Sequence, residues 1–148
     1  MKEYKRTIET YRIVKDKTDF NSVKIIGSAD AANFIRNFYL GDIGVFESFY
    51  LLLLNRSNNT TGYVKISQGG IEGTVTDLRI IAKYAIEGLA TAVIIAHNHP
   101  SGNLQPSDAD ISMTRRIKEA LGILDISVMD HLILTEDSYY SFADEGML

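Results

Sequence analysis

TAVIIAHNHPSGNLQPSDAD, residues 91–110, joins a short apolar run to a polar loop and then to the start of a helix. Residues 91–96 are almost wholly apolar, which is typical of a strand that is covered on both faces. Pro100 and Gly102 turn the chain, and residues 108–121 then show a helical spacing of apolar positions. A buried strand that leads through a loop into a helix indicates a layered α/β architecture.

Outward from this stretch, strand-like and helix-like segments are interleaved along the chain. Strands are expected where apolar runs lie between turn residues, and helices where apolar residues recur every three or four positions. The expected strands are residues 22–26, 45–54, 63–67, 91–96, 126–135 and 139–142, and the expected helices are residues 31–40, 76–87 and 108–121. Gly41, Gly88 and Gly122 are expected to end the three helices. The fold class is therefore α/β or α+β, in a single domain with about three helices.

The amino-acid composition excludes several classes of protein. The chain has 148 residues, of which 45% are hydrophobic and 23% charged, so it is not a wholly disordered or fibrous protein. Its net charge of −4 argues against a main role in coating phosphate backbones. It has no cysteine, which excludes disulfides, thiolate nucleophiles and zinc sites built on sulfur. Residues 1–17 lack the apolar core of a signal peptide and no apolar run is long enough to cross a bilayer, so we expect a cytoplasmic protein.

Two histidines, His97 and His99, follow the apolar run of residues 91–96. Side chains two positions apart on an extended chain point to the same side, so both imidazoles are expected to face one site. Asp110 lies in the first turn of the next helix on the face toward the sheet, whereas Asp108 points roughly the opposite way. The expected metal ligands are therefore His97, His99 and Asp110. They would leave one position of a tetrahedral zinc ion open for water.

Glu47 and Ser107 are the expected catalytic residues. Glu47 lies within the apolar run of residues 45–54, where an isolated carboxylate would be costly to bury. A metal-bound water would be a suitable partner, with Glu47 as general base and then acid. Ser107 opens the helix, where its hydroxyl and backbone N–H could stabilise an oxyanion.

Structural interpretations of the same residues also exist. A pair of histidines by itself is more often a surface or capping feature. The Ser107-x-x-Asp110 pattern is close to a helix capping box, which allows metal ligation only if Asp110 also turns toward the metal. Glu47 could instead be a buried carboxylate paired with an arginine such as Arg79.

A second histidine segment, Asp130–His131, lies near the end of the chain. We interpret His131 as outside the ligand set, either as a residue that contacts the ligands or as a packed residue. Asp130 could orient a ligand histidine, as carboxylates around metal sites often do.

These residues resemble the signature of the JAMM (MPN+, JAB) metalloprotease family. That signature has two histidines separated by one residue, then seven residues, then Ser-x-x-Asp, with a glutamate upstream. The matching residues are Glu47, His97, His99, Ser107 and Asp110. The segments HNHPSG (residues 97–102) and DHLI (residues 130–133) resemble the corresponding segments of the RadC-like branch. The resemblance covers roughly residues 25–145.

The resemblance implies a zinc-dependent hydrolase that cleaves peptide or isopeptide bonds and has a cytidine-deaminase-like fold with a mixed β-sheet. It divides the chain into an N-terminal arm or edge strand, residues 1–24, and a RadC-like JAB/MPN domain, residues 25–148. Zinc is the expected cofactor. We expect a protein or peptide substrate as partner, neither a direct nucleic-acid partner nor a membrane, and leave a homodimer open.

Other classes of function are weighed against this one. JAMM-like domains can act as protein-interaction modules, although such versions usually lack ligands that this chain keeps. A DNA-repair-associated role follows from the RadC likeness. The acidic charge counts against it, and residues 1–24 are too short for the helix-hairpin-helix domain of full-length RadC proteins. A base deaminase is excluded because zinc deaminases need a Pro-Cys-x-x-Cys segment.

Overall fold

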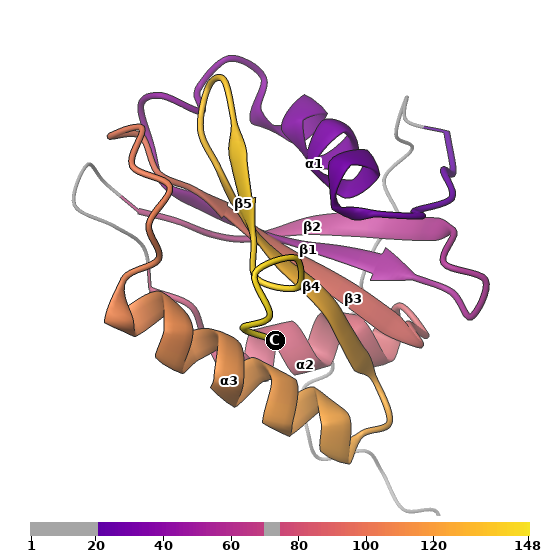
Figure 1. The fold of residues 1–148 in the computed structure, drawn as a ribbon. Helices are drawn as coiled ribbons and strands as arrows, with labels where there is room; N and C mark the ends of the chain where they lie inside the picture. Colours follow the sequence, from indigo (N-terminus) through magenta and orange to yellow (C-terminus); the bar gives the residue numbers. More distant parts are fainter. Residues whose placement is uncertain (1–20, 70–74) are drawn as a thin grey trace, which may run out of the picture.

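A five-stranded β-sheet is the centre of the structure, a computed structural model that describes residues 21–69 and 75–148 (Figure 1). The strand order is β2-β1-β3-β4-β5. The strands are β1 (Ser48–Leu54), β2 (Thr60–Gln68), β3 (Ala92–Asn98), β4 (Ser127–Leu134) and β5 (Tyr139–Ser141). β3 and β4 are parallel, and the other neighbouring pairs are antiparallel. The expected mixed sheet and α/β class are confirmed. The expected arm lies outside the described residues, apart from residues 21–24.

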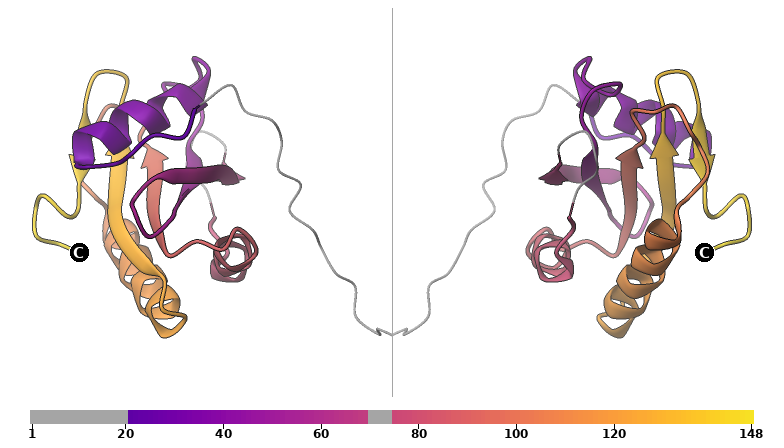
Figure 2. Two further views of the ribbon diagram at one scale, coloured as in Figure 1. Left: turned by 90° about the vertical axis from the view of Figure 1, so that its right-hand side faces the viewer. Right: turned by 90° about the vertical axis from the view of Figure 1, so that its left-hand side faces the viewer.

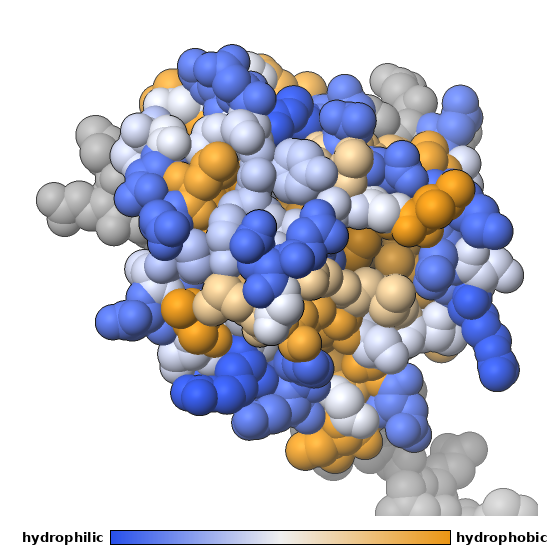
Figure 3. All heavy atoms as spheres, viewed as in Figure 1, coloured by the Kyte–Doolittle hydropathy of each residue, from blue (hydrophilic) through white to orange (hydrophobic). Residues whose placement is uncertain are grey.

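Helices cover both faces of this sheet (Figures 1 and 2). α1 (Ser28–Arg36) and the short 3-10 helix η1 (Asn37–Tyr39) pack on one face. α2 (Leu78–Glu87) and α3 (Asp108–Ile123) pack on the other. Between the helices and the sheet lie two separate apolar cores, and hydrophilic residues surround the apolar areas of the surface seen in Figure 3. No helix in the part of the chain that the structure describes is long and apolar enough to span a membrane.

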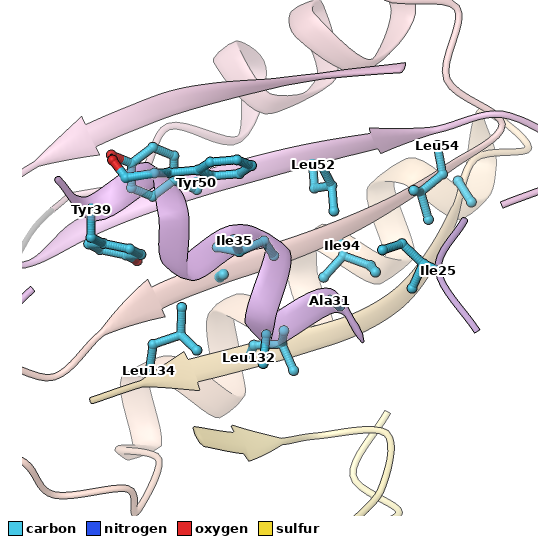
Figure 4. Packing of buried hydrophobic residues seen from close by; sticks show 14 residues of the cluster. Ile25, Ala31, Ile35, Tyr39, Tyr50, Leu52, Leu54, Ile94, Leu132 and Leu134 are labelled. Atoms are coloured by element: carbon cyan, nitrogen blue, oxygen red, sulfur yellow. The ribbon is translucent and has the colours of Figure 1, made fainter. Parts of the chain in front are cut away.

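The central strands β1 and β3 supply side chains to both cores. In β1, Leu52 and Leu54 face α1 (Figure 4), whereas Phe49 and Leu51 face α2 and α3. All seven residues of each strand are buried. Strands covered on both faces can be apolar throughout, which explains why their sequences show no alternation.

The N-terminal part of the domain departs from the expected elements. Residues 22–26 do not form a strand, because Lys24 makes only an isolated bridge with Asn59. β1 begins at Ser48 instead of residue 45, because the N–H groups of Val45 and Phe46 donate to the carbonyl of Asp42 within a turn. These hydrogen bonds keep the two residues out of the sheet, where they are 51% and 40% exposed.

The ends of the helices follow the expectations in part. α2 begins after Asp77 and ends at Gly88, as expected. Gly41, with a φ of +93°, follows the helical segment α1–η1 without capping α1. Gly122 lies inside α3 and does not end it. The left-handed position is taken by Asp125, with a φ of 57°.

The end of α3 is a Schellman motif built without glycine. The N–H of Ile126 donates to the carbonyl of Leu121 at 2.9 Å, and the N–H of Asp125 donates to the carbonyl of Gly122 at 3.1 Å. Aspartate tolerates the left-handed region better than most residues because its short polar side chain can hydrogen-bond locally. Gly122 is therefore an exposed helix-interior residue, and an added Cβ would meet no atom within 4 Å.

Replacement of Gly122 by alanine should raise the free energy of unfolding by about 0.5–1 kcal/mol, because alanine loses less backbone entropy in a helix. Denaturant unfolding measures the change. The matched control is Gly41→Ala, which should destabilise the protein because the native φ of Gly41 is +93°. Destabilisation by Gly122→Ala would contradict the position of the helix end.

Candidate metal centre

The candidate site lies at the carboxyl end of β3, on the sheet face that α3 covers. The side chain of His97 is 2% exposed, and its backbone lies in register with Phe49 of β1 and Ile133 of β4. His99 follows the strand, and its N–H donates to the carbonyl of Leu134 at 2.9 Å. The carboxyl ends of strands in α/β sheets are where ligands usually bind. Because β3 lies between β1 and β4, both imidazoles stand at the carboxyl end of a central strand.

Four of the side chains singled out in the sequence converge here. The Nε2 atoms of His97 and His99 are 3.0 Å apart. Oδ1 of Asp110 is 3.2 Å from Nε2 of His97, and its Oδ2 is 3.5 Å from Nε2 of His99. Oε1 of Glu47 is 4.0 Å from Nε2 of His97. Glu47, His97 and His99 each offer a ligand atom within 4.8 Å of the others, so they form a group that could hold a metal ion.

The carboxylate of Asp110 has two sets of partners. Oδ2 accepts the N–H of Ser107 at 2.7 Å, and the hydroxyl of Ser107 accepts the N–H of Asp110 at 3.1 Å. This is the capping box that the sequence pattern suggested, and Asp110 also faces the histidines. Because the N–H of Ser107 is taken by Asp110, the hydroxyl is the donor that remains for the expected role at an oxyanion.

The electrostatics keep Asp110 ionised. Its burial raises the pKa, but the hydrogen bonds that His97 and His99 donate when protonated at Nε2 outweigh the burial and hold the pKa of Asp110 well below its usual range. In return, the hydrogen bond to Asp110 raises the pKa of His99. An ionised carboxylate beside two imidazole nitrogens is a ligand set that divalent transition metals favour.

The second ring nitrogen of His99, Nδ1, also has a hydrogen-bond partner. Its Nδ1 is 2.6 Å from the backbone carbonyl of Asn103. A carbonyl oxygen can only accept, so Nδ1 carries the proton and donates it. In the neutral ring, Nε2 then has a free lone pair directed at His97 and Asp110.

Asn98, between the two histidines, has a role that the sequence analysis missed. Its side chain is fully buried and points to the face opposite His97. Its Oδ1 accepts the N–H of Ser48 at 2.7 Å, and its Nδ2 donates to the carbonyls of Ile43 and Phe46 at 2.6 and 2.8 Å. Asn98 therefore fixes the turn on both sides of Glu47. The signal available in the sequence was its alternate position within a buried strand.

His131 lies next to the candidate ligands and not among them. Its Nε2 is 2.8 Å from Nδ1 of His97, and its Nδ1 is 2.5 Å from the hydroxyl of Thr114. Burial lowers the pKa of His131 well below its usual value. Thr114 is a second residue that the sequence analysis did not single out.

Two structural interpretations from the sequence are wrong. Asp130 does not orient a ligand histidine, because the alternation of β4 turns it to the α1 side, where it accepts hydrogen bonds from Ser141 and Ala143. Glu47 does not pair with Arg79. The side chain of Arg79 is 90% exposed and pairs with Asp77 at 2.7 Å.

A cleft of about 400 Å³ opens beside His99. Residues 99–102 line one side of it, and residues 135–138, the turn between β4 and β5, line the other. Gly44 and Leu104 complete the lining. Of the residues in the cluster, His99 lines this cleft.

Known proteins match this chain over most of its length. Residues 25–147 match a family model described as RadC-like JAB domain. A UPF0758 protein of Flavobacterium johnsoniae is 46% identical over 124 residues, which are 84% of this chain and 53% of that protein. The UPF0758 protein YfjY of Escherichia coli is 43% identical over 102 residues, 69% of this chain and 64% of that protein. The UPF0758 protein NMB1038 of Neisseria meningitidis is 39% identical over 117 residues, 79% of this chain and 51% of that protein. These matches confirm the resemblance, and the chain spans about half to two-thirds of the length of these relatives.

Replacement of Asn98 by alanine should lower the free energy of unfolding by about 1–3 kcal/mol, because buried backbone groups such as the N–H of Ser48 lose their partner. Denaturant unfolding tests this. Asn33→Ala on the exposed side of α1 is the matched control and should change stability by less than about 0.5 kcal/mol. Equal effects of the two variants would contradict the role of Asn98.

Proposed function

This chain belongs to the RadC-like JAB domain family, and we propose that it is a zinc-dependent hydrolase that cleaves peptide or isopeptide bonds. The observation that carries the proposal is the convergence of His97, His99 and Asp110 on one point. The two Nε2 atoms are 3.0 Å apart beside an ionised carboxylate. With a proton on Nδ1 of each ring, neutral imidazoles would direct lone pairs at each other and at a negative charge. A divalent cation between them relieves that repulsion.

The donor set fits zinc in a site of the catalytic type. Two imidazole nitrogens and one carboxylate oxygen are typical of sites that leave a coordination position open. Asp110 is assigned to the metal because its Oδ1 is 3.2 Å from Nε2 of His97, whereas Oε1 of Glu47 is 4.0 Å away. Glu47 is then assigned to proton transfer. A bound zinc ion would act as a Lewis acid and lower the pKa of water at the open position.

The other residues would act around the scissile bond. Glu47 would accept a proton from the attacking water and return it to the leaving amine. The hydroxyl of Ser107 would donate a hydrogen bond to the carbonyl oxygen as negative charge develops there. Asn98 would keep Glu47 in place through the flanking turn. An unidentified protein or peptide is the proposed partner, and the cleft beside His99 is its proposed route to the site.

Protein purified without chelator should contain about one zinc ion per chain, and His97→Ala should lose it. Elemental analysis identifies the ion and counts it. Glu47→Gln should retain the metal because the proposal gives Glu47 no ligand role. A wild-type protein that takes up no metal even when zinc is offered would contradict the proposal and leave the protein-interaction module as the better function.

Glu47→Gln should slow hydrolysis by roughly 10²–10⁴-fold at unchanged metal content, since the amide cannot accept the proton. The rate is measured on a panel of fluorogenic peptides and lysine isopeptides, with whichever of them the wild type cleaves. Glu119→Gln, an exposed position on α3, is the control and should keep the wild-type rate. Full activity of Glu47→Gln would remove Glu47 from the mechanism.

A further inference from the structure

A buried chain of hydrogen bonds connects the backbone of α3 to His97. The hydroxyl of Thr114 donates to the backbone carbonyl of Asp110 at 2.6 Å. The same hydroxyl oxygen is 2.5 Å from Nδ1 of His131, and Nε2 of His131 is 2.8 Å from Nδ1 of His97. Thr114, His131 and His97 are at most 2% exposed. Water therefore has little access to any link of the chain.

The chemistry of each group sets the direction of every hydrogen bond. The carbonyl of Asp110 can only accept, so it takes the single hydroxyl proton of Thr114. The oxygen of Thr114 must then accept the proton on Nδ1 of His131. A neutral His131 has no second N–H, so its Nε2 accepts from Nδ1–H of His97. A proton of His97 is thereby placed on Nδ1. In the neutral ring this leaves a lone pair on Nε2, whereas a second proton there would donate to Asp110.

The surroundings of His131 favour its neutral form. The ring is fully buried, and it stacks on Phe142 with ring centres 4.7 Å apart. Phe49 lies on another side at 5.9 Å. A charged imidazolium in this pocket would lose its hydration without a directly bonded carboxylate on its ring nitrogens.

We propose that Thr114 and His131 are positioning residues that fix the tautomer of His97 and direct its Nε2 lone pair at His99 and Asp110. For a neutral His97 the tautomer follows from the hydrogen bond at its Nδ1, whereas its consequence for metal binding rests on the proposed function. Asp110 takes part twice, because its backbone carbonyl orients the relay and its carboxylate faces the histidines. Without the relay, the proton of His97 could occupy Nε2, the atom that the metal needs.

Nitrogen-15 NMR of the metal-free protein tests the tautomer directly. The chain has three histidines, so long-range proton–nitrogen correlations of histidine-labelled protein resolve each ring. At mildly alkaline pH, His97 and His131 should each carry their proton on Nδ1. A neutral His97 with its proton on Nε2 in place of Nδ1, or protons on both nitrogens of His131, would overturn the proposal. This experiment needs no bound metal and no activity.

Two substitutions of Thr114 test the consequence. Thr114→Val removes the hydroxyl at similar volume and should lower zinc affinity by about 10–100-fold, the usual effect of losing a partner of a ligand histidine. It should also release the tautomer preference of His97. Thr114→Ser keeps the hydroxyl and should stay close to wild type in both. Competition with a chelating dye measures affinity, and circular dichroism checks the fold.

The outcomes separate the two proposals. If the valine variant is destabilised but retains both the wild-type tautomer and the wild-type affinity, Thr114 is structural and the relay is wrong. If the wild type binds no zinc, the proposed function fails, and the NMR result still decides the relay.

Discussion

Burial of the negative charge on Asp110 is the constraint around which the site is arranged. An ionised carboxylate at the start of α3 needs strong partners, because an unpaired charge in the interior is expensive. It obtains them from the backbone of Ser107 and from two imidazoles. The same charge favours the helix N-terminus, where backbone N–H groups and the helix dipole attract anions. The start of α3 and the end of β3 are thereby held together by one side chain.

The alternation of side chains along β3 places His97 and Asn98 on opposite faces of the sheet. His97 points toward α3 and joins the cluster, whereas Asn98 points toward α1 and binds the turn that carries Glu47. Two adjacent residues thus organise both sides of the candidate site. Asn98 can be buried at the end of an apolar strand because its Oδ1 and its Nδ2 group both have hydrogen-bond partners.

Local sequence patterns were sufficient for the main elements and for the convergence of His97, His99 and Asp110, whereas Glu47 was indicated by its place in an apolar run and by the family resemblance. Spacing of two in a strand and of three in a helix is geometric, so it carries over from sequence to structure. The start of β1 was mistaken because an apolar run does not reveal that the N–H groups of residues 45 and 46 are used within a turn. The end of α3 was mistaken because Asp125 takes the left-handed position that glycine usually fills.

The contacts missed from sequence join distant segments. Asn98 binds groups 50 to 55 residues away, and Thr114 reaches His131 17 residues on. Such pairs become neighbours only after the strands are ordered in the sheet. The orientation of Asp130 also depends on how the strands are ordered. The register of β4 with β3 pairs Asp130 with Ile94, whose side chain lies on the α1 side of the sheet.

The exposure of the side chains differs across the cluster, and this difference supports the proposed function. The side chain of His97 is 2% exposed and that of Asp110 10%, whereas His99 and Glu47 are 16% and 17% exposed. The cluster therefore has a closed back formed by β3 and α3 and an open front at His99 and Glu47. A structural ion is enclosed by protein ligands, but a catalytic ion keeps one position for water. Here the open front includes Glu47, which the proposed function leaves out of the ligand set, and His99, which lines the cleft. In the proposed function, the reacting water would meet Glu47 at that side, where a general base is required.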